Sequence, residues 1–263
     1  MEKWFVMRKG APFQEIAEKF QIHPILARLI RNRDVIGDEA IQLYLNGTIA
    51  DLYDGMLMKD MDKAVDILLE KIREDKKIRI IGDYDIDGIN STYILLEGIK
   101  YLGGEADIDI PDRMKDGYGL NRNLIDRAFD DDIDTIITCD NGIAAREEIA
   151  YGKSLGMTKR YILPPADAVI DPKQQTCAYP FKELCGAGVA YKLIEALFGA
   201  CGKDIEDVDY LMENVAIATV GDVMDLVGEN RIFVKQGLEM LKRTNNLGLR
   251  ALMECTGVPV ERL

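Results

Sequence analysis

Three aspartates stand at alternating positions in the segment GDYDIDGINST, residues 82–92. Asp83, Asp85 and Asp87 are followed directly by Gly88. Like charges this close repel one another, so clustered carboxylates are disfavoured unless they are protonated or bridged by cations. Carboxylate oxygens suit Mg²⁺ and Mn²⁺ as ligands. The segment therefore predicts a divalent-cation site.

A further aspartate, Asp140, lies in the segment TCDNG at residues 138–142. Both acidic segments follow short runs rich in isoleucine, KIRII at 77–81 and IDTIIT at 133–138, which we interpret as buried strands. Ligands of open parallel sheets bind just beyond the carboxyl ends of the strands. Because both segments follow strands, we expect their carboxylates to converge at one edge of a sheet.

The elements around these strands alternate along the chain. Helical segments at 91–102, 122–129 and 144–156 separate segments expected as strands at 77–81, 105–110, 133–140 and 166–170. This alternation predicts an α/β fold, a parallel sheet of about five strands with helices on both faces. The residues before the first strand are mostly helical, with an amphipathic helix over 61–75, and the pattern is helical again after residue 183.

The composition is that of an ordinary globular protein, with 48% hydrophobic and 30% charged residues among 263. No apolar run approaches the roughly 20 residues that span a bilayer, and the first residues lack the apolar stretch of a signal peptide, so we expect no membrane partner. Five cysteines without a CxxC pair indicate reduced thiols in the cytoplasm. The net charge of −13 argues against a basic nucleic-acid-binding module. A nucleic-acid enzyme stays open, because a carboxylate cluster that holds metal is itself negative.

Other interpretations of the acidic segment are weaker. Runs of acidic residues are most often solvated faces, which suits DDDID at 130–134 but not carboxylates between an apolar strand and an apolar helix. A calcium EF-hand loop needs an acid at its twelfth position, where this chain has Ile94. Haloacid-dehalogenase-type phosphatases place D-x-D after a strand, but they want Thr or Val at the position of Asp87. The segment GAGVAYK at 186–192 has two of three dinucleotide-binding glycines and no preceding strand, so it favours helix packing.

The segment GDYDIDGINST resembles the first motif of the DHH phosphoesterases, and in particular of the RecJ-type single-stranded-DNA exonucleases. The resemblance extends to PDRMKDGYGLN at 111–121, TCDNGI at 138–143, LCGAGVAYKLIEAL at 184–197 and ATVGDVMDLVGENRIFVKQGLEMLKRT at 218–244. N-terminal segments such as ARLIRNR are also similar, so the match covers nearly the whole chain. It implies a helical N-terminal extension over residues 1–75 and a DHH-type catalytic domain over residues 76–263, without the DHH-associated domain that follows in relatives.

The resemblance implies a centre of two divalent ions, Mn²⁺ or Mg²⁺. Asp83 and Asp85 look like ligands of this centre. Asp140 resembles the carboxylate that both ions share, and Asp222, in VGDVMDL, resembles the last acidic ligand. A helix-terminal acid without a ligand role is the alternative for Asp222.

Neighbouring residues are implied to support the ligands. Asp87 would hold its neighbours by hydrogen bonding, and Gly88 lets the backbone turn into a helix close to the ions. Asn141 and Gly142 would shape the second metal loop.

The reaction that the resemblance implies is phosphodiester hydrolysis, since two divalent ions polarise a phosphodiester and activate a water. The implied substrate is single-stranded DNA, degraded from its 5′ end in repair or recombination, with a single-strand-binding protein and a helicase as further partners. Arg113 and Tyr118 are candidates for contact with the phosphodiester or a base; a structural role is the alternative. Two other functions stay open: an inactive DHH-like scaffold in a replication or repair assembly, and a phosphodiesterase of short oligonucleotides or cyclic dinucleotides.

One motif of the family is absent. Asp-His-His should end a strand after REEIAYGKSLGM, but GMTKRYILPP at 156–165 runs straight through. The only histidine, His23, precedes a proline at an expected helix start, where we interpret it as structural. Three explanations stay open: a mobile loop is left out of the sequence, which we favour, a segment has been deleted, or the protein is a natural inactive relative.

Overall fold

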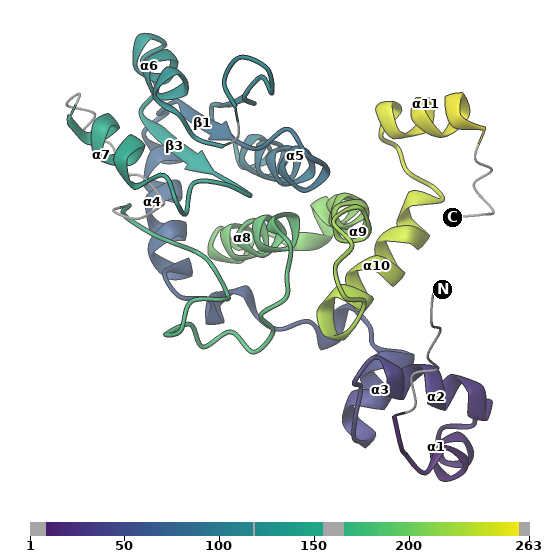
Figure 1. Cartoon of the computed structure of the whole chain (residues 1–263). Coiled ribbons are helices and arrows are strands. Elements are labelled where there is room, and N and C mark those ends of the chain that lie inside the picture. The colour runs from purple at the N-terminus through teal and green to yellow at the C-terminus, as the bar shows by residue number, and fades with distance from the viewer. Residues whose placement is uncertain (1–8, 118, 155–165, 258–263) are drawn as a thin grey trace, which may run out of the picture.

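The structure is a computed structural model that describes residues 9–117, 119–154 and 166–257 (Figure 1). The strands are β1 (Ile78–Ile81), β2 (Ala106–Asp109) and β3 (Thr135–Thr138). The α-helices are α1 (Phe13–Phe20), α2 (Pro24–Asn32), α3 (Asp38–Asn46), α4 (Met61–Arg73), α5 (Ile86–Tyr101), α6 (Arg122–Asp130), α7 (Arg146–Ser154), α8 (Gly186–Ala200), α9 (Met212–Gly221), α10 (Gly228–Leu241) and α11 (Leu247–Thr256). Short 3-10 segments are η1 (Ile49–Asp51), η2 (Gly55–Leu57) and η3 (Ile205–Leu211).

The strands form one parallel sheet in the order β2–β1–β3. Ile78 of β1 lies opposite Ala106 of β2 on one side and opposite Thr135 of β3 on the other. The β-branched sequences IRII and TIIT favour a pleated, buried setting, and all four residues of β1 are buried. The predicted parallel α/β fold is therefore confirmed, and the carboxyl ends of the three strands share one edge.

The number of strands differs from the prediction of about five, because the described residues contain three. The run at 166–170, expected as a strand, forms none. Its backbone finds other partners: the Val169 N–H donates to Asp60 Oδ2 at 3.1 Å, and the Val169 carbonyl accepts from Gln174 Nε2 at 2.8 Å. These side chains replace a strand ladder. Residues 155–165, where the family's Asp-His-His strand is absent from the sequence, lie outside the described residues.

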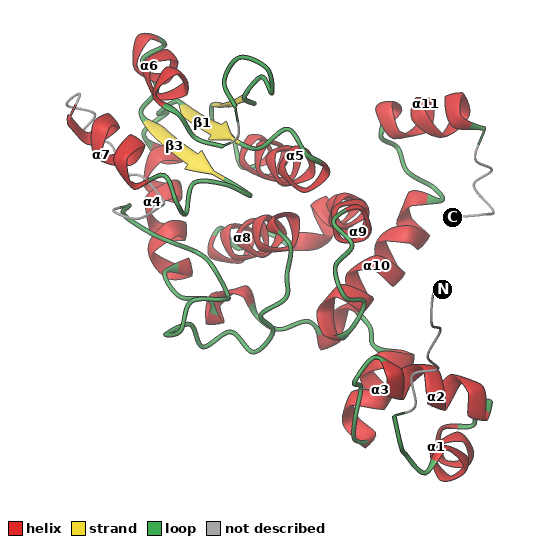
Figure 2. Cartoon of the chain, in the orientation of Figure 1, coloured by secondary structure: helices red, strands yellow, loops and turns green. Residues whose placement is uncertain are grey.

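Helices cover both faces of the sheet (Figure 2). Ile80 and Ile137 face the main core, which α4, α5, α8 and α9 complete. Ile81 and Ile136, their neighbours along the strands, face a second core with α6 and α7. Successive side chains of a strand point to opposite faces, so the sheet lies between two packed layers of helices, and the loops that follow β1 and β3 start from its edge. The predicted placement of helices on both faces is confirmed.

The N-terminal helices α1, α2 and α3 pack around a small separate cluster that includes Ile30, Val35 and Ile41. His23 precedes α2, and its Nδ1 accepts the backbone N–H of Ile25 at 3.2 Å. The histidine therefore serves as a helix cap. In contrast, α4 contributes its buried face, including Leu68, to the main core. The boundary at residue 75 between an extension and a catalytic domain stays a prediction.

Across the described ranges, none of the helices is both long enough and apolar enough to cross a membrane.

Candidate metal centre

The loop after β1 holds Asp83 and Asp85 in different surroundings. Asp83 is fully buried, and its Oδ1 accepts the N–H of Tyr84 at 2.7 Å. Its Oδ2 is buried without a hydrogen-bond partner among the described residues. Asp85 caps α5, because its Oδ1 accepts the N–H of Gly88 at 2.9 Å. A Cβ on Gly88 would lie 2.5–2.7 Å from the backbone of Asp83, so the close turn into the helix requires glycine.

Asp87 connects this loop to another helix. Its two carboxylate oxygens accept the backbone N–H groups of Gly186 at 2.6 Å and Ala187 at 2.7 Å, the first residues of α8. The Ser91 hydroxyl, one turn further along α5, donates to the Asp87 carbonyl at 2.7 Å. The N-terminus of a helix has unpaired N–H groups and a positive dipole end, so it is a favourable place for a carboxylate. Asp87 thus fixes α8 against α5.

Asp140 follows β3 and lies beside the first loop. Burial and the nearby negative charges of Asp87 and Asp85 raise the pKa of Asp140 to about 9. A Cβ on Gly186 would lie 3.0 Å from Asp140 Cβ and 3.1 Å from Asp87 Oδ2, so the start of α8 touches both aspartates. The structure therefore brings together carboxylates that are more than fifty residues apart in the sequence.

Asp222 approaches the same group from the end of α9, where it is the C-cap residue. Burial and the charges of Asp87 and Asp85 raise its pKa. A Cβ on the preceding Gly221 would lie 2.6 Å from Ile86 Cδ1, so the end of α9 touches the start of α5. Asp222 therefore lies near the loop after β1, and its role as a ligand stays a prediction.

The remaining predicted residues lie around this group. The Asn141 side chain donates from Nδ2 to the carbonyl of Ile81 at 3.3 Å and so links the loops after β3 and β1. Gly142 has a φ of 89°, which favours glycine. The Arg113 guanidinium lies 5.4 Å from the centre of the Tyr84 ring, next to Asp83. Tyr118 lies outside the described residues.

A cavity of about 410 Å³ opens between the end of β3 and α8. Asp140, Asn141 and Gly142 line it, together with apolar side chains that include Val189 and Leu193. Asp83, Asp85 and Asp222 do not line this cavity. Of the four aspartates predicted as metal ligands, Asp140 therefore lines this cavity and the other three lie outside its lining.

The donor chemistry fits a hard divalent ion. Within the described residues, no three His, Cys, Asp or Glu side chains already surround one point as a preformed metal cage would require. Nevertheless, Asp83 Oδ2 is a buried oxygen without a hydrogen-bond partner in the described part of the chain, and burial together with carboxylate repulsion raises the pKa values of Asp140 and Asp222. A bound cation would satisfy the oxygen and offset the repulsion.

Sequence reasoning missed the backbone N–H groups of Gly186 and Ala187 as part of this site. The segment GAGVAYK was interpreted as helix packing, and its position at a helix N-terminus, after Cys185, was the available signal. Tyr84 was also missed. It lies between the first two aspartates and carries the guanidinium of Arg113 on its ring.

Comparison with known proteins identifies the family. The model of the DHH family, N-terminal domain, matches residues 77–219, more than half of the chain. The chain is 39% identical over 268 residues to the single-stranded-DNA-specific exonuclease RecJ of Bacillus subtilis (strain 168), covering 97% of this chain and 33% of that protein. It is 31% identical over 262 residues to RecJ of Escherichia coli (strain K12), covering 92% and 45%.

Solved structures agree. A crystal structure of RecJ in complex with Mn²⁺ from Thermus thermophilus superposes with a TM-score of 0.76 at 27% identity, covering 94% of this chain and 36% of that one. A crystal structure of exonuclease RecJ bound to manganese gives a TM-score of 0.70 at 31% identity, covering 81% and 55%. The chain thus spans between about a third and about a half of these relatives. Because the family model covers most of the α/β unit and both aspartate loops, we conclude that this chain belongs to the DHH family.

Proposed function

We propose that this chain is the N-terminal part of a metal-dependent phosphodiesterase, an exonuclease that degrades single-stranded DNA from the 5′ end in repair or recombination. The observation that carries the proposal is that Asp140 and Asp222 lie close to Asp85 and Asp87, where burial and these neighbouring charges raise the pKa values of Asp140 and Asp222. Clustered acids of this kind are costly without a cation. The names of the relatives, single-stranded-DNA-specific exonucleases, supply the substrate class.

Asp83, Asp85, Asp140 and Asp222 would hold the Mn²⁺ or Mg²⁺ ions. Bound divalent ions polarise a phosphodiester and lower the pKa of a water at the site. The chain's own groups set the frame for this chemistry. Asp87 holds the start of α8 in place, and Gly88 allows the loop after β1 to enter α5 directly.

Substrate contact is proposed for Arg113 and Tyr118. The Arg113 guanidinium is exposed and lies over Tyr84, beside the aspartates, so it is placed to neutralise a phosphate.

A single-strand-binding protein and a helicase are proposed as further partners, on the resemblance to RecJ alone. We also propose a cytoplasmic location, in keeping with free Cys139, Cys177, Cys185, Cys201 and Cys255.

The missing Asp-His-His segment bears on the activity of this chain as written. The alignment with the Bacillus subtilis relative spans 268 positions, more than the 263 residues of this chain, so the relative has residues without a counterpart here. The family's histidines would contribute a nitrogen ligand and a contact to the substrate phosphate. Misplacing the reacting groups by about 1 Å can cost about 100-fold in rate. The 263-residue chain should therefore show little or no nuclease activity.

The test is a nuclease assay on the 263-residue chain and on a longer form that includes the Asp-His-His segment and the following domain. The longer form should degrade long single-stranded DNA with Mn²⁺. Asp83→Ala or Asp140→Ala in it should abolish degradation, whereas Asp130→Ala, an exposed acid at the end of α6, should not. If the 263-residue chain digests DNA as fast as the longer form, the account of the missing motif is wrong.

A scaffold function is the second candidate, favoured by one observation. The only histidine, His23, caps α2 and is therefore committed to the structure. A scaffold would bind single-stranded DNA or protein partners without hydrolysis even in the longer form. A phosphodiesterase of short oligonucleotides or cyclic dinucleotides would cleave dinucleotides faster than long strands in the same assay.

A further inference from the structure

The residues that follow β2 form a tight turn, residues 112–116, that is closed by its own first side chain. Asp112 Oδ1 accepts the N–H groups of Met114 at 2.9 Å and Lys115 at 3.1 Å. The N–H of Asp116 donates to the carbonyl of Asp112 at 2.8 Å. An aspartate that accepts the N–H groups two and three residues on favours a local turn, but it does not fix the position of that turn relative to the sheet.

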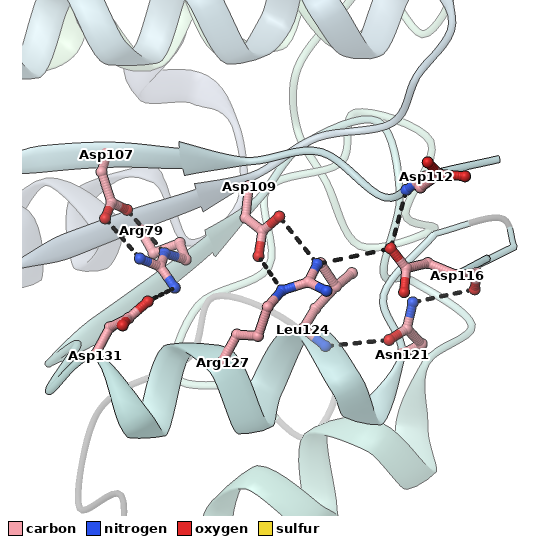
Figure 3. Close-up of polar contacts among 9 residues, drawn as sticks. All are labelled: Arg79, Asp107, Asp109, Asp112, Asp116, Asn121, Leu124, Arg127 and Asp131. Atoms are coloured by element: carbon pink, nitrogen blue, oxygen red, sulfur yellow. Dashed lines mark hydrogen bonds and ion pairs between the residues drawn. The ribbon is translucent and has the colours of Figure 1, made fainter. Parts of the chain in front are cut away.

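Arg127 of α6 ties this turn to the sheet (Figure 3). Its Nε and Nη2 donate to the two oxygens of Asp109, the last residue of β2, at 3.0 and 3.1 Å. The same Nη2 lies 3.7 Å from Asp116 Oδ2. That oxygen also accepts the N–H of Asp112 at 3.0 Å. One guanidinium thus joins the end of the strand to both ends of the turn.

Asn121 adds a second connection between the turn and α6. Its Nδ2 donates to the carbonyl of Asp116 at 3.2 Å, and its Oδ1 accepts the N–H of Leu124 at 3.1 Å as the cap of the helix. The turn is therefore held at its carboxyl end by the helix that carries Arg127 (Figure 3).

The turn lies at the edge of the sheet that carries the candidate metal centre. Arg113 reaches Tyr84, in the loop of Asp83 and Asp85, with its guanidinium 5.4 Å from the ring centre. On the other side, a Cβ on Gly119 would lie 3.7 Å from Asn141 Cβ. Arg113 and Gly119 thus lie against the loops after β1 and β3, respectively.

The tip of the turn exposes a cation and an apolar side chain in a protein of net charge −13, and Lys115 Nζ lies 4.0 Å from Asp112 Oδ2. Met114 is 91% exposed, and the Lys115 side chain is 83% exposed. Neutralisation of phosphates by cations dominates nucleic-acid affinity. An exposed thioether can also pack on the face of any base. This pair, with Arg113, fits one strand of nucleic acid.

We propose that Arg127 and Asp116 are positioning residues that fix the turn 112–116, and that its tip, Met114 and Lys115 beside Arg113, is a contact surface for single-stranded nucleic acid. The proposal rests on the proposed function for the identity of the ligand. Arg127 is about half exposed, so its ion pairs contribute little to the stability of the whole chain. Its loss should loosen the turn rather than unfold the protein.

The first experiment measures hydrogen exchange of the backbone amides of residues 112–116 in the 263-residue chain. Arg127→Gln should accelerate exchange there by about tenfold while the urea midpoint stays close to that of the wild type. Arg127→Lys should restore only part of the protection, because Lys cannot bind Asp109 in a bidentate manner. The matched control is Asp107→Asn, which removes from β2 the acid that pairs with Arg79 at 2.7 and 2.8 Å (Figure 3). It should leave exchange in the turn unchanged.

The second experiment measures binding of fluorescent oligothymidine by the same chains at low ionic strength without divalent metal. Arg127→Gln and the double change Met114→Ala, Lys115→Gln should each weaken binding about fivefold to tenfold. Unchanged exchange in Arg127→Gln would overturn the positioning role. Unchanged affinity, or no binding by the wild type, would overturn the contact surface. Neither experiment requires hydrolysis, so a failure of the nuclease assay leaves both outcomes readable.

Discussion

The carboxylate of Asp87 accepts the backbone N–H of Gly186 at 2.6 Å, although 99 residues separate the two in the sequence. This bond, with its neighbour to Ala187, places the start of α8 against the start of α5. Asp140 lies against the same point, because Gly186 touches it as well. The geometry of the candidate metal centre therefore depends on a carboxylate that is used for helix docking.

Replacing Asp87 with Ala should destabilise the protein strongly. The change removes the acceptor for two backbone N–H groups in a buried setting, and hydrogen bonds to charged groups contribute about 1.5–3 kcal/mol each. Part of the loss is offset because Asp140 loses a negative neighbour. We expect the free energy of unfolding in urea to fall by about 3 kcal/mol. Asp130→Ala, at an exposed position, should change it by less than about 0.5 kcal/mol. Equal effects of the two changes would contradict the docking role.

Two glycines of α8 should respond in opposite directions to alanine. A Cβ on Gly186 would meet Asp140 Cβ and the Ser91 hydroxyl at 3.0 Å, so Gly186→Ala should cost about 1–3 kcal/mol through overpacking. A Cβ on Gly199 would meet nothing within 4 Å, so Gly199→Ala should stabilise the helix by about 0.5–1 kcal/mol. Thermal unfolding of both variants checks the pair. A stabilising Gly186→Ala would contradict the close contact of Gly186 with Asp140 and Ser91.

Glu213 gives the protein a pH dependence with a defined sign. Its side chain is buried, its Oε1 accepts from the Thr244 hydroxyl at 2.8 Å, and its Oε2 has no hydrogen-bond partner in the described part of the chain. Burial raises the pKa of Glu213 above its ordinary value, and the Thr244 bond only partly counteracts this. The folded form therefore retains the proton where the unfolded form has lost it, so stability falls as pH rises from about 4 through the folded pKa.

The variant Glu213→Gln isolates this effect, since the amide does not titrate. Urea unfolding at a series of pH values should give a stability difference, wild type minus variant, that is most favourable below pH about 4 and declines toward neutral pH. A difference that is constant with pH, or that grows with it, would contradict the raised pKa.

Much of the fold and part of the site could be predicted from the sequence because local signals agree there. The isoleucine-rich run ending at Ile81, the glycine after Asp87 and the polar start of α5 all indicate one strand-to-helix turn. Asp140 has the same context, so its position at the same sheet edge follows from the parallel arrangement. These inferences need only short-range patterns and the common direction of parallel strands.

The errors have long-range causes. The run at 166–170 has the composition of a strand, but Val169 bonds to side chains of Asp60 and Gln174 instead of a neighbouring strand, which no local pattern reveals. Similarly, the alternating aspartates look equivalent in sequence. In the structure Asp85 caps α5, whereas Asp87 accepts backbone N–H groups of α8. This difference could not be predicted from the local sequence, because it depends on the packing of a helix a hundred residues away.

Manganese should bind to the 263-residue chain at one weak site. The acidic ligands supply oxygens, but the absent histidines leave the second position short of ligands, so of the two ions we expect the second to bind more weakly still or not at all. Binding to the folded form raises stability by RT ln(1 + [L]/Kd), about 1.4 kcal/mol at ten times Kd. Thermal unfolding at increasing MnCl₂ concentration should show this rise for the wild type. Asp83→Asn should show little of it, because the change replaces Asp83 Oδ2, the buried oxygen without a hydrogen-bond partner among the described residues.

The same measurement tests whether Asp222 is a ligand. The matched control for Asp222→Asn is Asp225→Asn, because Asp225 is an exposed acid three residues further on. Asp225→Asn should respond to Mn²⁺ like the wild type, whereas Asp222→Asn should respond less. If the two variants respond alike, Asp222 is a helix-terminal acid and the metal assignment is restricted to the loops after β1 and β3.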